Sequence, residues 1–105
     1  MKTLKGFEKK YLRGLAHDLK PVILIGKEGI TDGIVRVTDE GLCQHELIKI
    51  KFNEFKEKEQ KKPLTNELVD QTGSALIGTI GHTAILFRPQ TDPVKRRIQL
   101  PTKGK

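Results

Sequence analysis

Residues 21–31 read PVILIGKEGIT, and this stretch decides the fold. Residues 21–25 are a continuous aliphatic run of strand length, and unbroken apolarity predicts a strand buried on both faces. Residues 26–29 interrupt the run with two glycines. Thr31 is then a good N-cap for a helix that runs to about Gln44. The stretch therefore predicts a buried strand, a glycine-containing loop and a helix, in that order.

A helix is also predicted before this strand, over residues 3–19. Its apolar side chains recur at helical spacing on one arc, and basic side chains occupy the opposite arc. The apolar arc holds Leu4, Phe7, Tyr11, Leu12, Leu15 and Leu19, and the basic arc holds Lys2, Lys5, Lys9, Lys10 and Arg13. Lys20 ends the helix, because a residue before proline avoids the helical conformation.

A half-exposed strand and a third helix are predicted downstream. Residues 47–52 alternate between apolar and lysine side chains, which is typical of a strand with one exposed face. Residues 54–62 interleave charges, which predicts a solvated helix face or a loop. Pro63 suits a helix start, and Gly73 suits a helix C-cap.

Two short strands, over residues 75–80 and 83–87, lie close enough in sequence for a tight hairpin. The element order is then α-β-α-β-α-β-β, which indicates an α/β fold with a mixed sheet covered by helices. A chain of 105 residues has room for one domain, which we place at residues 1–101. Residues 89–105 are basic and hold few apolar side chains, so we expect a mobile C-terminal tail.

Composition restricts the class of function. Lysine and arginine number 20 against 13 acidic residues, and the formal net charge of +7 favours polyanionic partners. Cys43 is the only cysteine, which excludes an internal disulfide and favours a reducing compartment. No apolar run is long enough to cross a membrane or follows the charged N-terminus, so we expect a cytoplasmic protein without a membrane partner.

The chain has no recognisable catalytic or cofactor motif. Cys43 and His45 lack a second pair of ligands at zinc-finger spacing. His17 and His82 lack a nucleophile at a known spacing. Gly26-Lys27 lacks both the upstream glycine and the following serine or threonine of a P-loop. We therefore predict no enzyme, no catalytic residue, no cofactor and no metal site.

The loop Gly26-Lys27-Glu28-Gly29 is the most informative segment for function. Its glycines leave backbone N–H groups unshielded, and the following helix adds further amides and the positive end of its dipole. A G-x-x-G loop of this kind can clamp a nucleotide backbone, although an ordinary tight turn between strand and helix is the alternative. The five aromatic residues and the absence of tryptophan favour backbone recognition over base stacking. The predicted RNA-binding residues are Gly26, Lys27, Glu28, Gly29, Lys20, Lys5, Lys9 and Arg13.

Several short blocks of the sequence, taken together, resemble one family. The blocks are LRGLAH (12–17), LKPV (19–22), IGK (25–27), GIT (29–31), HELIK (45–49), TG (72–73), IG (80–81) and RP (88–89). Over about residues 3–101 they resemble the CRM domain (chloroplast RNA splicing and ribosome maturation), and above all its stand-alone bacterial members, the YhbY-like proteins. Residues 52–63 match poorly, as an insertion would.

The resemblance implies a four-stranded mixed sheet with helices, related to the C-terminal domain of translation initiation factor three. It also implies RNA binding through Gly26, Lys27 and Gly29, and association with precursors of the large ribosomal subunit. Glu28 departs from the family, whose loop is usually basic or neutral at this position.

Three classes of function stay open at this point. The first is a monomeric RNA-binding accessory factor for large-subunit assembly, with ribosomal RNA or pre-ribosomal particles as its partner. The second is a protein–protein adaptor that docks on ribosomal proteins or a translation factor, and that would keep its partner after nuclease treatment. The third is an enzyme acting on a phosphorylated small molecule, which needs a convergent acid and base that the sequence does not supply.

Overall fold

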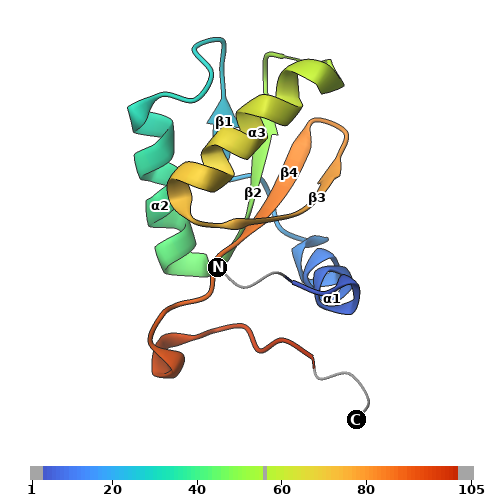
Figure 1. Ribbon diagram of the computed structural model, residues 1–105, viewed down its shortest axis with the longest axis vertical. Coiled ribbons are helices and arrows are strands. Elements are labelled where there is room, and N and C mark those ends of the chain that lie inside the picture. The colour runs from blue at the N-terminus through green and yellow to red at the C-terminus, as the bar shows by residue number, and fades with distance from the viewer. Residues whose placement is uncertain (1–3, 56, 102–105) are drawn as a thin grey trace.

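A four-stranded mixed sheet forms the centre of the computed structural model, which describes residues 4–55 and 57–101 (Figure 1). The elements are α1 (Gly6–Ala16), β1 (Ile23–Ile25), α2 (Asp32–His45), β2 (Leu47–Phe52), α3 (Lys58–Thr72), β3 (Ala75–Ile80), β4 (Thr83–Phe87) and a short 3-10 helix, η1 (Pro93–Lys95). The strand order is β1-β2-β4-β3, with β1 parallel to β2 and the other neighbours antiparallel. The α/β class, the mixed sheet and the predicted order of elements are confirmed. The first helix is shorter than the predicted range of residues 3–19, because α1 spans Gly6–Ala16 and neither residues 4–5 nor residues 17–19 are helical. Residue 3 and the end of the tail, residues 102–105, lie outside the described residues.

Helices cover both faces of the sheet, so the domain has two hydrophobic cores. Under α2 and α3, the buried core includes Ile25, Leu42, Ile50, Phe52, Leu68 and Leu86. Under α1, it includes Leu12, Ala16, Ile77, Ile85 and Phe87. The alternation predicted for β2 is confirmed, because Ile48, Ile50 and Phe52 all face the first of these cores.

The strand β1 lies at one edge of the sheet, and the prediction that it is buried on both faces is wrong. Ile23 and Ile25 are buried, but Leu24 between them is 56% exposed. The cause is the position of α1, which packs against β2 and β3 and leaves β1 uncovered on that side. An edge strand with one open face can still be a continuous aliphatic run.

The helix α1 buries a narrower stripe than the predicted arc. Leu12 and Ala16 are fully buried, whereas Tyr11, Leu15 and Leu19 are exposed. Residues four apart lie on the same line of a helix, so Leu12 and Ala16 form one contact line against the sheet. The apolar arc predicts that Leu15 is part of the core, and this prediction is wrong.

The boundaries of α2 and α3 follow from their caps. Thr31 caps α2 as predicted, since its Oγ1 accepts a hydrogen bond from the Ile34 amide at 3.1 Å. The predicted start of α3 at Pro63 is wrong, because Gln60 accepts a hydrogen bond from the Glu57 amide at 3.2 Å and the helix begins at residue 58. Gly73 ends α3 with a φ of 65°, the left-handed conformation that glycine tolerates.

The described part of the C-terminal segment is attached to the domain through Glu46. This residue is fully buried, with a φ of 64°, at the junction of α2 and β2. Its carboxylate accepts hydrogen bonds from the amides of Gln90 at 2.7 Å, Arg97 at 2.7 Å and Ile98 at 3.0 Å. Ile98 also packs against the core under α1, together with Leu100. Mobility of the tail stays a prediction. Release of the described part of the tail from the domain requires these contacts to break.

Candidate functional site

The loop Gly26-Lys27-Glu28-Gly29 is a closed turn. The Gly29 amide donates a hydrogen bond to the Gly26 carbonyl at 3.0 Å. Gly29 has a φ of +73°, which a residue with a side chain adopts only at a cost, and a Cβ there would lie 3.6 Å from Leu64 Cδ2 of α3. The turn itself therefore accounts for Gly29 and uses its amide, so this N–H group is not available to a ligand.

Gly26 has no comparable structural explanation. Its φ lies outside the left-handed range, and a Cβ added to it would meet no atom within 4 Å. Gly26, Lys27 and Glu28 are all exposed. The amides of Lys27 and Glu28 make no hydrogen bond with any residue that the structure describes. The loop thus presents open backbone to solvent at its first three positions.

The N-terminus of α2 adds two amides beside this turn. Of the three amides predicted to be available, that of Ile34 is used by the Thr31 side chain. The amides of Asp32 and Gly33 have no partner within the described residues. The N-terminal N–H groups of a helix carry partial positive charge, so the open end of the turn is electropositive in its backbone as well as at Lys27.

The structure does not bring the predicted basic residues together at the loop. Figure 1 shows the loop that follows β1 at the upper end of the molecule and α1, which carries Lys5, Lys9 and Arg13, at the lower end. Lys20 precedes β1 while Gly26 follows it, so these two residues lie at opposite ends of the strand. The predicted residues therefore form two groups, one at the loop and one at and after α1.

Two of the basic side chains near α1 have structural partners. The Arg13 side chain lies over Gly78, where a Cβ would be 3.0 Å from Arg13 Cδ, and its guanidinium donates to the Ile77 carbonyl at 3.4 Å. The Lys49 ammonium donates to the carbonyls of His17 at 3.2 Å and Leu19 at 2.9 Å. These carbonyls lie in the segment between α1 and β1, so Lys49 attaches that segment to β2.

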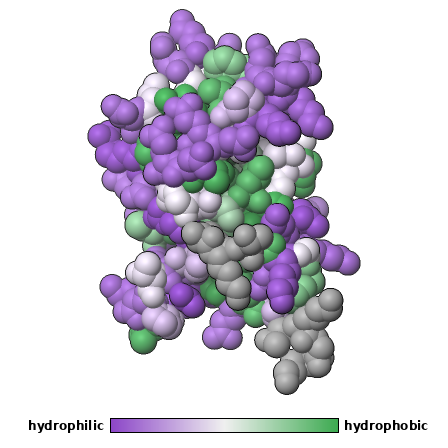
Figure 2. All heavy atoms as spheres, viewed as in Figure 1, coloured by the Kyte–Doolittle hydropathy of each residue, from purple (hydrophilic) through white to green (hydrophobic). Residues whose placement is uncertain are grey.

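Sequence reasoning missed a second basic surface at the loop end of the sheet. Residues 54–62 were predicted only as a solvated face or loop, but α3 begins within them and lines a groove with Lys58, Lys61 and Lys62. One turn of α3 connects the two features, since Leu64 approaches Gly29 while Lys61 contacts the β3–β4 hairpin. Figure 2 shows hydrophilic side chains gathered over this upper end of the molecule. The spacing of Lys58, Lys62 and Asn66, four residues apart, was the available signal for one exposed helix stripe.

Other kinds of site find little support in the described residues. Within residues 4–55 and 57–101, no three His, Cys, Asp or Glu side chains are grouped to hold a metal ion. The Cys43 sulfur instead accepts a hydrogen bond from Arg88 at 3.1 Å. None of the described helices is both long enough and apolar enough to span a bilayer.

Comparison with known proteins places the chain in a family. The CRS1 / YhbY (CRM) domain description matches residues 4–88. A Haemophilus influenzae protein named RNA-binding protein is 40% identical over 103 residues, which is 98% of this chain and 100% of that protein. The Bacillus subtilis protein named Probable RNA-binding protein YqeI is 35% identical over 98 residues, 93% of this chain and 99% of its own length. The solution structure of the Staphylococcus aureus hypothetical protein SAV1595 matches with a TM-score of 0.77 and 36% identity, covering 94% of this chain and 100% of that one. On these matches and on the fold itself, the chain belongs to the CRS1 / YhbY (CRM) domain family.

Proposed function

We propose that this protein binds RNA by its phosphate backbone, through the turn at Gly26 to Gly29 and the basic side chains near it. The proposed partner is ribosomal RNA within precursors of the large ribosomal subunit. The protein's proposed role there is that of an assembly factor without catalytic activity. Relatives over nearly the full chain are named RNA-binding proteins, and the formal charge of +7 suits a polyanion.

The observation that carries the proposal is the open backbone at Gly26. A glycine that no turn geometry and no neighbour requires is explained if a ligand needs to approach the chain closely at that point. The unpartnered amides of Lys27 and Glu28 lie within the closed turn, and those of Asp32 and Gly33 lie at the N-terminus of α2 that follows it. An anion can accept hydrogen bonds from N–H groups of this kind. Lys27 supplies the mobile positive charge at the tip.

The group at α1 is proposed as a second, separate contact. Lys5, Lys9 and Lys20 add positive charge at the lower end of the molecule, away from the loop. An RNA that touches both groups has to follow the outside of the domain between them. The contribution of α1 is therefore expected to grow with the length of the RNA, whereas that of the loop is expected to be present with short fragments.

A substitution at Gly26 tests the proposal with little risk to the fold. Gly26→Asp adds a side chain in open space and places a negative charge beside the proposed phosphate. Like charges about 4 Å apart repel by about 1 kcal/mol in water, so RNA affinity should fall by at least about fivefold. Gln44→Glu is the matched control, since it makes the same change of charge at an exposed position at the far end of α2. Equal losses in the two variants would show that only net charge matters, and would refute the role of the loop.

One observation favours the adaptor as a second candidate. On the face of the sheet that α1 leaves open, the strand registers place Leu24, Lys51, Thr83 and Ile80 in one row. Leu24 is 56% exposed and Ile80 63% exposed, and exposed apolar side chains in a row are a feature of protein interfaces. Association with pre-ribosomal particles that survives nuclease treatment and is lost in Leu24→Ser with Ile80→Ser would support the adaptor over the RNA-binding protein.

A further inference from the structure

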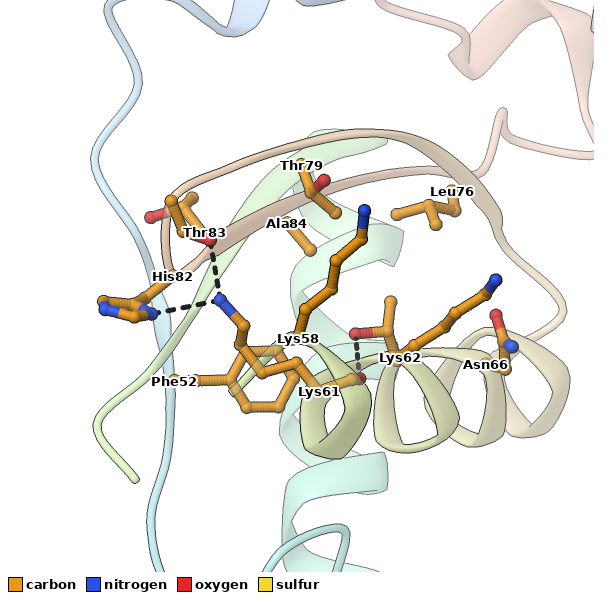
Figure 3. A pocket seen from close by; sticks show the side chains of 12 residues that line it. Phe52, Lys58, Lys61, Lys62, Asn66, Leu76, Thr79, His82, Thr83 and Ala84 are labelled. Carbon is orange, nitrogen blue, oxygen red and sulfur yellow. Dashed lines mark hydrogen bonds between the residues drawn. The ribbon is translucent and has the colours of Figure 1, made fainter. Parts of the chain in front are cut away.

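The groove between α3 and the β3–β4 hairpin encloses a volume of about 420 Å³ (Figure 3). Its floor is apolar and is formed by Phe52, Leu76 and Ala84. Its rim is polar and is formed by lysines of α3 on one side and by Thr79 and His82 of the hairpin on the other. Sites for small organic groups have this construction, an apolar floor with a few polar groups at the edge, and volumes of about 300–1,000 Å³.

Lys61 fixes the shape of the groove. Its ammonium donates hydrogen bonds to the Gly81 carbonyl at 2.9 Å and to His82 Nδ1 at 3.0 Å. An ammonium has no acceptor, so the ring nitrogen must accept and a neutral His82 carries its proton on Nε2. Lys61 thereby connects α3 to the tip of the hairpin at the groove.

Lys58 and Lys62, in contrast, have no hydrogen-bond or ion-pair partner among the described residues. Both are exposed, and Figure 3 shows their side chains extending from α3 toward the strand that carries Thr79 and Leu76. They are four residues apart, so their backbone positions differ by about 6 Å along the helix. Among the described residues that line the groove there is no Asp or Glu. Two positive charges therefore lie side by side along the apolar groove, and no acidic residue among those lining it neutralises them.

We propose that this groove holds one unpaired nucleotide of the bound RNA. The flat face of the base covers the floor formed by Phe52, Leu76 and Ala84, and the phosphates on either side of it contact Lys58 and Lys62. Asn66 and Thr79 offer hydrogen-bond donors and acceptors to the edge of the base. The inference rests on the proposed function, to which it adds a requirement for single-stranded RNA and a site separate from the turn.

The arrangement suits a nucleotide within a chain better than a free nucleotide. The two lysines lie along the helix instead of converging on one point, and so match successive phosphates of a strand. The same turn of α3 reaches Gly29 through Leu64, so a strand leaving the groove continues over α3 toward the turn. A duplex cannot place a base in the groove, because its bases are paired and stacked.

A pair of double variants measures the lysine contacts. Lys58→Ala with Lys62→Ala is compared with Lys95→Ala with Arg97→Ala, which removes the same charge at exposed positions of the C-terminal segment, outside the turn, α1 and the groove. For a single-stranded RNA hexamer of adenosine, two lost phosphate contacts should reduce the slope of log affinity against log salt by about 1.4. This corresponds to a loss of about 25-fold in affinity at 0.1 M salt. Equal losses in the two double variants would refute the groove.

The methyl resonances of Leu76 and Ala84 report on the base. The hexamer should shift both, because an aromatic base above a methyl group changes its shielding, and a blocking variant, Thr79→Phe, should abolish the shifts. Duplex RNA of the same composition and inorganic phosphate should leave both resonances unmoved. Shifts of the same size with adenosine monophosphate at equal affinity would mean a free-nucleotide site, and would overturn the assignment to RNA.

The outcomes separate this inference from the proposed function. If the hexamer binds, and Gly26→Asp weakens it while the groove variants do not, the groove proposal is wrong and the proposed function stands. If the unmodified protein binds neither hexamer nor duplex, both are wrong. Binding that both the Gly26 and the groove variants weaken, each beyond its own control, supports both.

Discussion

The carboxylate of Glu46 accepts a hydrogen bond from the backbone amide of Ile98 at 3.0 Å, although the two residues are 52 positions apart. Glu46 is fully buried and also accepts from the amides of Gln90 and Arg97. A carboxylate that receives three amide hydrogen bonds is a strong anchor, because each bond to a charged acceptor is stronger than a neutral one. The segment after β4 is therefore attached at several points.

We predict that Glu46→Ala releases this segment without unfolding the domain. The variant removes the acceptor of three amides, and a buried amide without an acceptor costs about 1–3 kcal/mol. The segment avoids this cost when it leaves the domain, because its amides then donate to water. Hydrogen exchange at Gln90, Arg97 and Ile98 should become fast, and the free energy of unfolding should fall by about 2 kcal/mol. Glu40→Ala, at an exposed position of α2, is the control. Unchanged protection of the three amides would show that the segment is held by other contacts.

We predict that Leu12→Ala and Leu15→Ala differ strongly in stability. Leu12 is fully buried against the sheet, so its truncation should cost about 2–5 kcal/mol. Leu15 is 42% exposed, and its truncation should cost less than about 1 kcal/mol. Chemical denaturation of both variants measures the difference. A larger loss for Leu15 would mean that α1 presents a different face to the sheet.

The local signals that predicted the fold were those with short-range causes. The N-cap at Thr31, the C-cap at Gly73, the alternation over residues 47–52 and the hairpin depend on neighbours within a few residues, and all are confirmed. The phase of α1 and the exposure of β1 depend on which half of the sheet the helix covers. Contacts between segments that are distant in sequence determine which half of the sheet α1 covers. Hydrophobic periodicity within one segment carries no information on such contacts.

Only part of the candidate site could likewise be predicted from the sequence. The two glycines predicted the turn, but nothing in the sequence predicted its closure by the Gly29 amide. The lysines of α3 lie in a run of mixed charge, which did not predict a basic surface. Some residues that carried the family resemblance are structural. Arg88, for example, donates to Asp39 at 2.6 Å and to the Thr72 carbonyl at 2.7 Å, which ties α2 to the end of α3. A residue typical of a family can thus serve the fold and not the ligand.

We predict that Thr38→Val stabilises the domain. The Thr38 hydroxyl is buried in α2 and has no hydrogen-bond partner among the described residues. Replacing an unsatisfied buried hydroxyl by a methyl group should raise the free energy of unfolding by about 1 kcal/mol, since valine and threonine have similar helix propensities. Thr72→Val should do the opposite, because that hydroxyl lies 2.8 Å from both the Leu68 carbonyl and Ser74 Oγ. Thermal melting of both variants shows whether each substitution raises or lowers stability. A loss of stability in Thr38→Val would indicate that the hydroxyl has a hydrogen-bond partner in solution.

The acidic residue at the tip of the turn provides the sharpest test of the proposed phosphate contact. Glu28 is exposed and acidic, so it would repel a phosphate bound at the neighbouring amides. Glu28→Lys removes about 1 kcal/mol of repulsion and adds about 1 kcal/mol of attraction at about 4 Å, so it should tighten RNA binding by about thirtyfold. Gly29→Asp is unsuitable as the opposite change, because the φ of +73° would strain the turn whether or not RNA binds there.

The control is Glu40→Lys, which makes the same substitution at an exposed position in the second half of α2. Both variants raise the net charge of the whole protein equally, so long-range attraction of RNA increases by the same amount in each. Titration of a single-stranded RNA hexamer at about 0.1 M salt, where charges more than about 10 Å apart are largely screened, leaves mainly the local difference. A gain confined to Glu28→Lys supports a phosphate at the turn. Equal gains in the two variants would mean that the turn between β1 and α2 holds no phosphate, and that the protein attracts RNA only through its overall charge.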